Sequence, residues 1–542
     1  MNRLLFVIVA VLLLGQTAQA QSPDNYPPDD TTITITSTNL PIVWINVDGA
    51  TIDREVRIPA RMKIIHNGDG QLNYADTVAH PGQRIDYEGN IALRYRGNSS
   101  FSNSDKKPYS FRTLEQPLTE GDKKKKVDIL GMGKDNNWAL MAPYSDKSMI
   151  RDLLTYELAR PWMEYVPKGR FCEVYLDSIY YGVYVLSEVV SKGKHRLNLD
   201  DPGETGDELT GGYLMEVDCD EGVTHKSKHH PVAINGYVLA DHDIFFQYKS
   251  PDYEDMTEAQ IEYINNSIDQ MEDVFASSNY RDPEVGYRKY IDVDNFVDYQ
   301  LFMELCHNVD AYRLSGKFFK RRDSVDSRFK MVLWDTNLGY GVAKYLGGYR
   351  NDTWMYQNNN TMYMAHETYL IPFWWYKLNR DEYYWNKRNA RWIQLREANL
   401  SKERIWATID SLVDVLKCQG ALDRNTQAWP RWGQYVWPIY YVSSDYDDEI
   451  AYIKKWLIGR LKWLDKKMGY TPPVVLGDVD DDGVVDITDV TTLVDILIRN
   501  EVDEDLQTRS DLNSDGEVTI DDLTALIDYL LRGSLDDQPV AE

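Results

Sequence analysis

Two twelve-residue segments near the carboxyl end of the chain carry the oxygen ligands that a calcium ion requires. Calcium takes six to eight oxygens, and a loop of this length supplies them from positions 1, 3, 5, 7, 9 and 12. Both segments have Asp or Asn at positions 1, 3 and 5, Gly at position 6 where the chain must turn, and Asp at position 12. The predicted ligands are Asp478, Asp480, Asp482, Val484, Asp486 and Asp489 in the first loop, and Asp511, Asn513, Asp515, Glu517, Thr519 and Asp522 in the second.

The two loops are repeats of one unit, because the second begins 33 residues after the first. A short apolar helix is expected after each, over 490–498 and 523–531, and no helix of EF-hand length is expected before either. This loop–helix duplication resembles a type I dockerin over residues 477–535. The resemblance implies a small all-α domain with two calcium ions and a cohesin domain of a scaffold protein as its partner. The alternative is an acidic disordered tail, which would not repeat Gly at position 6.

The acidity of the chain is concentrated in this segment. From Gly477 to the end there are 20 acidic and 3 basic residues, whereas the net charge of the whole chain is −27. The acidity therefore reflects calcium sites and solubility, and it argues against nucleic acid as a partner. Clustered carboxylates repel one another, so we expect the segment to fold only with metal bound.

The amino terminus has the pattern of a secretory signal peptide over residues 1–20. Arg3 precedes an apolar run over 4–14, and Ala18 and Ala20 give a small-x-small end. The run is short for a bilayer span, although an uncleaved anchor is the alternative. We therefore expect a secreted protein with no membrane span after cleavage. Residues 21–39 are expected to be a flexible leader, 471–476 a linker, and 536–542 a tail.

The residues between leader and linker have an α+β pattern. Short alternating runs predict strands over 42–47, 61–66, 91–96, 109–113, 171–176, 181–190 and 212–217, with a helix over 148–160. The second half is mostly helical, with helices expected over 258–276, 293–305, 371–377, 385–398, 404–416 and 449–467. Strands first and helices second could enclose a cleft between two lobes.

Two acidic motifs in the helical half have an order that protein kinases also use. Asp310 follows an apolar helix, with Ser315 five positions on, and Asp335 follows a strand over 329–333, with Asn337 two positions on. In kinases one Asp orients the substrate hydroxyl and a second, after a strand, holds magnesium on the phosphates. Taken alone, an Asp after a helix is more often a cap.

Basic residues in the first half could meet phosphate. Arg96 begins a Gly/Asn/Ser loop, and Lys107 starts the next strand. Phosphoryl transfer needs cations that neutralise the phosphate oxygens, and a flexible Gly/Ser loop lets backbone amides approach them. The alternative is a surface hairpin with solvated basic side chains.

Six ordered motifs together resemble the spore-coat CotH family, which is similar to atypical protein kinases of reduced, two-lobed fold. They are Arg96-Gly-Asn-Ser with Lys107-Pro-Tyr, Asn137-Trp-Ala-Leu with Tyr144-Ser-Asp146-Lys-Ser-Met-Ile-Arg151, Gly182-Val-Tyr184-Val-Leu-Ser-Glu188, Gly212-Tyr-Leu-Met-Glu216, Asn308-Val-Asp310, and Trp334-Asp335-x-Asn337-x-x-x-Gly341. The resemblance implies a kinase-like domain over residues 40–470 that transfers the ATP γ-phosphate to Ser or Thr of extracellular proteins.

The resemblance also implies a role for each matching residue. Asp310 corresponds to the catalytic Asp, and Asp335 holds Mg²⁺ or Mn²⁺ with Asn337 assisting. Arg96 and Lys107 would meet the ATP phosphates, and Glu188 would lie near the adenine. Asp152 or Glu157 could pair with the lysine, a choice that the sequence leaves open. Ser315 departs from the kinase pattern, because a second metal-binding Asn is usual there.

Two other readings compete with a kinase. One is a non-catalytic pseudokinase that serves as an adhesion or scaffold component, since ATP is scarce outside cells. The other is a carbohydrate-binding or carbohydrate-degrading protein, suggested by the company dockerins keep and by abundant Trp and Tyr. The sequence favours a monomer, since nothing in it argues for an obligate oligomer.

Overall fold

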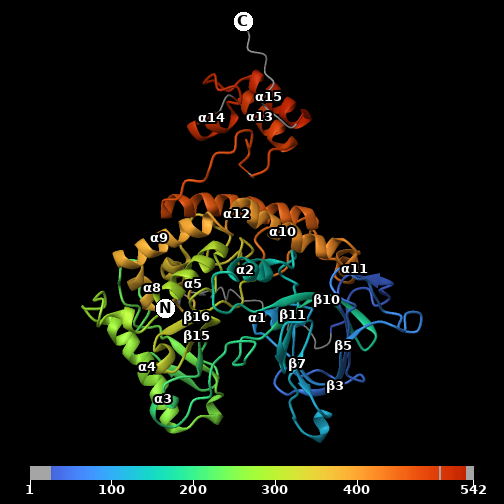
Figure 1. Cartoon of the computed structure of the whole chain (residues 1–542), viewed down its shortest axis with the longest axis vertical. Coiled ribbons are helices and arrows are strands. Elements are labelled where there is room, and N and C mark those ends of the chain that lie inside the picture. Colours follow the sequence, from blue (N-terminus) through green and yellow to red (C-terminus); the bar gives the residue numbers. More distant parts are fainter. Residues whose placement is uncertain (1–25, 482, 500–501, 533–542) are drawn as a thin grey trace, which may run out of the picture.

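The structure is a computed structural model that describes residues 26–481, 483–499 and 502–532. A strand-rich part and a helix-rich part lie side by side, and long helices cover both along one edge (Figure 1). The helices that follow the predicted linker stand beyond that edge. Helices and strands are both abundant, which confirms the α+β prediction. Within the described residues no helix is long and apolar enough to cross a membrane.

Seven of the described strands close into a barrel in the order β10-β11-β9-β6-β5-β3-β2. All neighbours are antiparallel except β2 and β10, whose parallel pairing closes the barrel. The predicted strands are present, and β9, which the sequence did not predict, completes the circle. The barrel strands are β2 (Ile42–Asn46), β3 (Ile58–Ile65), β5 (Ile85–Tyr95), β6 (Tyr109–Leu114), β9 (Asn137–Met141), β10 (Gly169–Leu176) and β11 (Ile179–Glu188).

The segment predicted to be a flexible leader packs against this barrel where the structure describes it. The side chains of Ile33 and Ile35 are buried, and the Ile35 N–H donates to the Tyr175 hydroxyl at 2.8 Å. The guanidinium of Arg431 forms an ion pair with Asp29 at 2.9 Å. Because every second residue of Ile33–Ile35 is apolar, this stretch buries one face instead of remaining free, which corrects the prediction for these residues.

Helix α2 (Arg151–Ala159) lies between β9 and β10 in the chain and begins within the predicted span. The Arg151 side chain is fully buried and forms ion pairs with Asp146 at 2.5 Å and with Glu449 of α12 at 2.9 Å. A buried guanidinium needs such partners, because an unpaired charge in the interior is costly. The Glu449 pair fixes α2 to a helix nearly 300 residues further along the chain, and the Asp146 pair fixes Arg151 to the segment just before α2.

The helix-rich part contains a second, five-stranded antiparallel sheet in the order β13-β14-β12-β15-β16. The sequence predicted β12 and β16 but not the others. The strands are β12 (Tyr213–Asp218), β13 (Thr224–Lys226), β14 (Phe245–Ser250), β15 (Gly316–Lys320) and β16 (Phe329–Val332). Smaller elements are the pairs β1 (Ser37–Thr38) with β4 (Asn73–Tyr74) and β7 (Val127–Asp128) with β8 (Lys134–Asp135), and the short helices α1 (Ser99–Ser102), α3 (Gly206–Leu209), α6 (Asp323–Asp326) and α7 (Asn359–Met364).

Seven further helices cover this sheet or run along the edge shared with the barrel, and the predicted ones are present within a few residues of their expected ends. They are α4 (Glu258–Ala276), α5 (Val293–Cys306), α8 (Phe373–Leu378), α9 (Glu382–Arg396), α10 (Lys402–Lys417), α11 (Ala421–Ala428) and α12 (Tyr446–Met468). Helix α5 is buried on nearly every side, as expected of a helix that is apolar around its circumference. It is the central helix from which the candidate site emerges.

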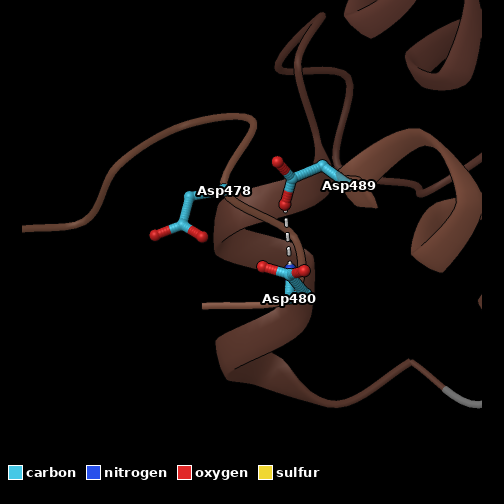
Figure 2. A group of neighbouring side chains, drawn as sticks. All are labelled: Asp478, Asp480 and Asp489. Atoms are coloured by element: carbon cyan, nitrogen blue, oxygen red, sulfur yellow. Dashed lines mark hydrogen bonds between the residues drawn. The ribbon is translucent and has the colours of Figure 1, made fainter. Parts of the chain in front are cut away.

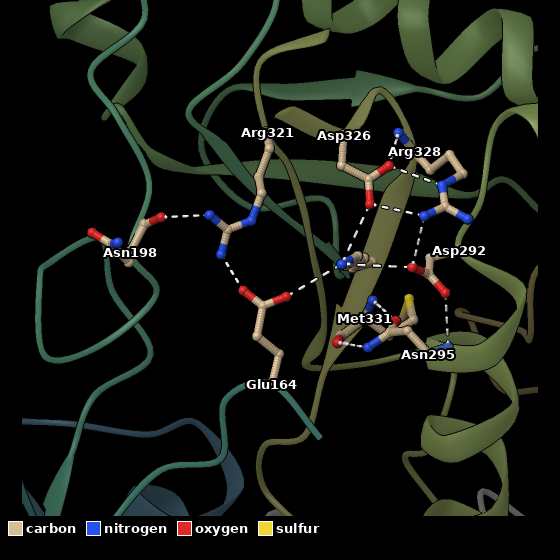
Figure 3. Close-up of polar contacts among 9 residues, drawn as sticks. Glu164, Asn198, Asp292, Asn295, Arg321, Asp326, Arg328 and Met331 are labelled. Carbon is tan, nitrogen blue, oxygen red and sulfur yellow. Dashed lines mark hydrogen bonds and ion pairs between the residues drawn. The ribbon is translucent and has the colours of Figure 1, made fainter. Parts of the chain in front are cut away.

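A polar network joins the segment after α2 to the β15–β16 hairpin (Figure 3). The Glu164 carboxylate pairs with Arg321 and with Lys330, the latter at 3.3 Å. Arg321 also donates to the Asn198 carbonyl at 2.9 Å, on the segment that leaves the barrel. Lys330 lies 3.5 Å from Asp292, at the start of α5. The network therefore fixes the barrel side relative to the hairpin that leads to Asp335.

The segment after the linker folds around a small core of its own. Its helices are α13 (Ile487–Arg499), α14 (Glu504–Ser510) and α15 (Ile520–Arg532). Helices α13 and α15 contain the two predicted helices and begin three residues earlier, whereas the short α14 was not predicted. The buried apolar residues are Val479, Val490, Leu493, Leu512, Ala525 and Leu526.

Candidate functional sites

Asp310 lies just beyond the buried helix α5. His307 ends the helix with a left-handed backbone (φ +52°), which turns the chain out of the helix axis. The Asp310 carboxylate accepts a hydrogen bond from Arg313 at 2.8 Å. Burial raises the pKa of Asp310, and the Arg313 guanidinium opposes that rise. The residue is thus a partly buried acid paired with Arg313 rather than a helix cap.

Asp335 lies three residues after β16 and is held beside the Asp310 segment. Its backbone is also left-handed (φ +58°), and its carbonyl accepts a hydrogen bond from the Asn308 side-chain amide at 2.7 Å. Its carboxylate accepts hydrogen bonds from Asn337 at 2.7 Å and from the Ser315 hydroxyl at 3.3 Å. The structure therefore brings together the two acidic motifs that are separate in the sequence.

Burial raises the pKa of the Asp335 carboxyl, and the nearby Asp310 carboxylate raises it further. Arg96, at the end of β5, lowers it, and its guanidinium lies 5.4 Å from the centre of the Trp334 ring. The Nη1 atom of Arg96 is buried and has no hydrogen-bond partner among the described residues. No ion pair with a basic side chain is seen for the Asp335 carboxylate among the described residues, so its negative charge is one that a divalent cation could neutralise.

Asp152 on α2 is the third acid of this region. Its carboxylate accepts hydrogen bonds from the Thr336 N–H at 2.7 Å and the Thr336 hydroxyl at 3.0 Å. Burial and then Asp335 raise the pKa of Asp152 to about 7. Glu157 instead pairs at the surface with Arg160 at 2.7 Å. Of the two acids left open by the sequence, Asp152 is the one near the site, and Arg96 is a cation beside it.

The side chains of Lys107 and Glu188 are both buried, and each has partners within the protein. The Lys107 ammonium donates to the Phe101 carbonyl at 2.6 Å and lies 4.5 Å from the centre of the Phe101 ring. Glu188 is fully buried, pairs with Arg196 at 2.5 Å, and accepts a hydrogen bond from the Lys168 N–H at 3.0 Å. Their predicted roles at phosphate and adenine stay predictions.

Arg313, the partner of Asp310, forms a second ion pair with Glu367 that the sequence did not predict. The second amino group of Arg313 pairs with Glu367 at 2.9 Å, so that one guanidinium bridges the two carboxylates. Tyr345 lies nearby, since Asp310 contributes to the raised pKa of its hydroxyl after burial. Arg313 is three residues after Asp310, a spacing that could have been noticed, but no local signal connects Glu367 or Tyr345 to the site.

A polar pocket of about 440 Å³ lies between the barrel and the second sheet. The barrel contributes Arg112 and Asn137, and the sheet contributes Lys249. The Lys249 ammonium pairs at 2.7 Å with the buried Glu216, which also pairs with Lys317. After burial and Asp310, Glu216 makes a smaller contribution to the raised pKa of Asp335. The charges beside the pocket therefore influence the Asp335 carboxyl.

In the first predicted calcium loop, three of the predicted ligands lie close together. Carboxylate oxygens of Asp478, Asp480 and Asp489 lie within 4.8 Å of one another (Figure 2). The Gly483 N–H donates to Asp478 at 2.9 Å, and Asp489 accepts from the Asp480 N–H at 3.1 Å. Burial raises the pKa of Asp489 to about 6. These oxygens fit a hard divalent cation. The predicted ligand Asp482 lies outside the described residues.

The second loop has the same backbone pattern. Asp511 accepts a hydrogen bond from the Gly516 N–H at 2.8 Å, as Asp478 does from Gly483. The fully buried Asp522 accepts from the Thr519 N–H at 2.8 Å. Among the described residues, only the first loop has three acidic groups gathered closely enough to hold an ion. The second loop has Asn513 where the first has Asp480, so one of its predicted ligands is a neutral amide.

Comparison with known families assigns a family to each of the two parts of the chain. The family described as CotH kinase protein matches residues 93–464, and the type I dockerin domain matches residues 476–531. Because the first match covers more than half of the chain, the protein belongs to the CotH kinase family. It also carries a dockerin, which implies calcium binding and a cohesin partner. No curated protein showed significant similarity to the chain.

Proposed function

We propose that the protein is an exported, atypical protein kinase that transfers the γ-phosphate of ATP to Ser or Thr of extracellular proteins. In this proposal Asp310 is the catalytic Asp that orients the acceptor hydroxyl and accepts its proton, Asp335 with Asn337 holds Mg²⁺ or Mn²⁺, and Arg96 faces the phosphates. The dockerin attaches the enzyme to the cohesin of a scaffold protein. The signal peptide over 1–20 provides the export route, and we propose that the protein acts as a monomer.

The observation that carries this proposal is the convergence of Asp310, Asp335 and Arg96. They come from the end of a helix, the end of a strand and the edge of the barrel, and their charges influence one another. Phosphoryl transfer is catalysed mainly by positioning and by neutralising charge on phosphate oxygens. A cluster with a cation-binding carboxylate, an arginine and a second carboxylate has the components that this requires.

The 440 Å³ pocket is where we place the nucleotide. It lies between the two β-structures and contains cations from both sides, including Arg112 and Lys249. A triphosphate that extends from this pocket toward Asp335 would pass the Glu216 network, where Lys249 and Lys317 compensate the buried carboxylate. This placement would put the γ-phosphate between Asp335 and Arg96.

Asp310 would orient the acceptor hydroxyl for in-line attack. The hydroxyl oxygen forms a bond to the γ-phosphorus while the bond from that phosphorus to the bridging oxygen of ADP breaks. Arg313 holds the Asp310 carboxylate in place, and Asp310 accepts the proton that the hydroxyl loses. A metal bound at Asp335 would neutralise the phosphate oxygens when present.

The test is transfer of label from γ-labelled ATP by purified protein with magnesium or manganese. We expect phosphorylation of the protein itself or of a general acceptor, with at least a hundredfold loss in Asp310→Ala and in Asp335→Ala. Nucleotide binding, measured as a thermal shift, should persist in Asp310→Ala. The absence of both transfer and nucleotide-induced stabilisation would contradict the proposal.

A pseudokinase is the second candidate, and Ser315 favours it. A hydroxyl at this position hydrogen-bonds the Asp335 carboxylate itself, where kinases use an amide that holds a second metal. Nucleotide binding without transfer would support this candidate, which would serve as an adhesion or scaffold component. Retention on insoluble polysaccharide, abolished by substitution of exposed Trp, would instead favour a carbohydrate-binding function.

A further inference from the structure

The kinase-like part and the dockerin touch each other at the first calcium loop. Lys402, the first residue of α10, extends its ammonium to the Asp481 carbonyl at 2.7 Å and to the Asp481 carboxylate at 2.9 Å. The same ammonium lies 3.7 Å from the carboxylate of Asp478, which is position 1 of the loop and a predicted calcium ligand. In Figure 1 the dockerin stands on the side where α10 and α12 form the edge of the larger part.

The contact is close and includes the carbon chain of the lysine. A Cβ atom added to Gly483, at position 6 of the loop, would approach the Lys402 Cδ atom to 2.6 Å. Gly483 has φ +91°, so the loop backbone needs glycine here and the absence of a side chain leaves room for Lys402. The lysine side chain is only 16% exposed, which makes it part of an interface rather than a solvated surface group.

Asp481 attracts cations from three elements. Arg509 of α14 pairs with it at 2.8 Å from within the dockerin, and Lys402 and Lys462 act on it from the larger part. Although burial opposes it, these cations lower the pKa of Asp481. Asp481 is position 4 of the loop, which is not a ligand position, so its carboxylate is available for this contact. A second attachment therefore exists besides the linker.

The two calcium loops differ in their contacts with the kinase-like part. The described side-chain contacts of the second loop come from within the dockerin, such as the Gln507 amide on the Gly516 carbonyl. The first loop has a permanent positive charge from another part of the chain beside one of its ligands. Since a calcium ion bound between the ligands would be repelled by that ammonium, the loops should differ in calcium affinity.

We propose that Lys402 is an intramolecular clamp that docks the dockerin on α10 and competes with calcium at the first loop. Calcium binding and the clamp weaken each other by the same factor, because a coupling between two equilibria is reciprocal. A protein with calcium in both loops then has a dockerin held only by its linker. A protein with calcium in the second loop alone has a folded dockerin that stays against the kinase-like part.

The test compares calcium binding by the full chain and by two variants, Lys402→Gln and Lys417→Gln. Lys417 is the matched control, because it lies at the other end of the same helix and pairs with Asp447. Calorimetric titration gives the two affinities, and glycine-selective ¹⁵N spectra assign them through the Gly483 and Gly516 amides. We expect the wild-type first loop to bind more weakly than in Lys402→Gln, by roughly tenfold at low salt.

Two results decide the proposal. In wild-type protein, small-angle scattering should show an increase in maximum dimension when calcium is raised from a level that fills only the second loop to one that fills both. Lys402→Gln should be extended already at the lower level. Lys417→Gln should behave as wild type in both experiments. An unchanged affinity of the first loop in Lys402→Gln, or a dimension that does not respond to calcium or to the substitution, would overturn the proposal.

Discussion

The molecule gathers carboxylates in two regions, and it does so in opposite ways. In the dockerin loops the acids lie within twelve residues of one another, and the backbone N–H groups of the same loop orient them. In the candidate kinase site Asp152, Asp310 and Asp335 come from distant segments, and side chains from other segments hold two of them, Thr336 on Asp152 and Ser315 on Asp335.

This difference determines what stabilises each region. The described contacts of the predicted ligand acids in the loops are mostly to backbone N–H groups, so calcium should be a structural component of the dockerin. The acids of the candidate kinase site have arginines beside them, Arg313 at Asp310 and Arg96 near Asp335, so this region should keep its fold without a metal. A metal would then be structural in one region and functional in the other.

Removal of calcium should produce the largest effect. With excess chelator we expect the helical signal of the dockerin and its thermal transition to disappear, while the transition of the larger part stays within a few degrees. Circular dichroism and differential scanning calorimetry on the full chain measure both. If both transitions shift together, the larger part also depends on calcium, which would contradict a structural role for the metal in the dockerin alone.

Substitution of Arg96 tests whether arginine side chains compensate the acids of the candidate kinase site. Arg96→Gln removes the cation that offsets Asp335 and Asp152, so we expect a loss of about 2–3 kcal/mol in the free energy of unfolding of the larger part. Chemical denaturation measures it, with Arg84→Gln, an exposed residue paired with Asp86, as the control.

Asp335→Asn combined with Arg96→Gln should recover part of that loss, because it removes one of the uncompensated charges. Equal stability of the double and single variants would mean that Arg96 contributes packing on Trp334 rather than charge compensation.

The sequence predicted the dockerin loops in more detail than the candidate kinase site, because the loop acids are close in sequence and the acids of the kinase site are not. The dockerin loops could be read residue by residue, because their ligands have a fixed spacing and a Gly at a fixed position. The motifs also predicted Asp310 and Asp335, and the structure brings them together through Asn308. The sequence could not choose Asp152 or find Glu367, because these depend on tertiary contacts. It also missed most of the second sheet, whose strands are short and interrupted.

A buried acid away from both regions shows that a raised pKa alone does not mark a site. Glu272 on α4 is fully buried, and its carboxylate accepts a hydrogen bond from the Ser227 hydroxyl at 2.5 Å. Burial raises its pKa from 4.5 to about 8, although the Ser227 hydroxyl lowers it; Asp269 and Asp273 add to the rise and Lys228 opposes it.

Because the folded state holds this proton more tightly than the unfolded state, Glu272 costs stability progressively as the pH rises from about 4.5 to 8. Glu272→Gln should therefore match wild type near pH 4.5 and exceed its free energy of unfolding by about 1–2 kcal/mol at pH 8.

The gain is smaller than the full pKa shift implies, because the Gln amide still lacks a partner at the buried Oε1 position. Denaturation at several pH values, with the exposed Glu262→Gln as control, measures it. A gain independent of pH would show that packing, rather than ionisation, sets the effect, and activity should be unchanged in either case because no reacting group is touched.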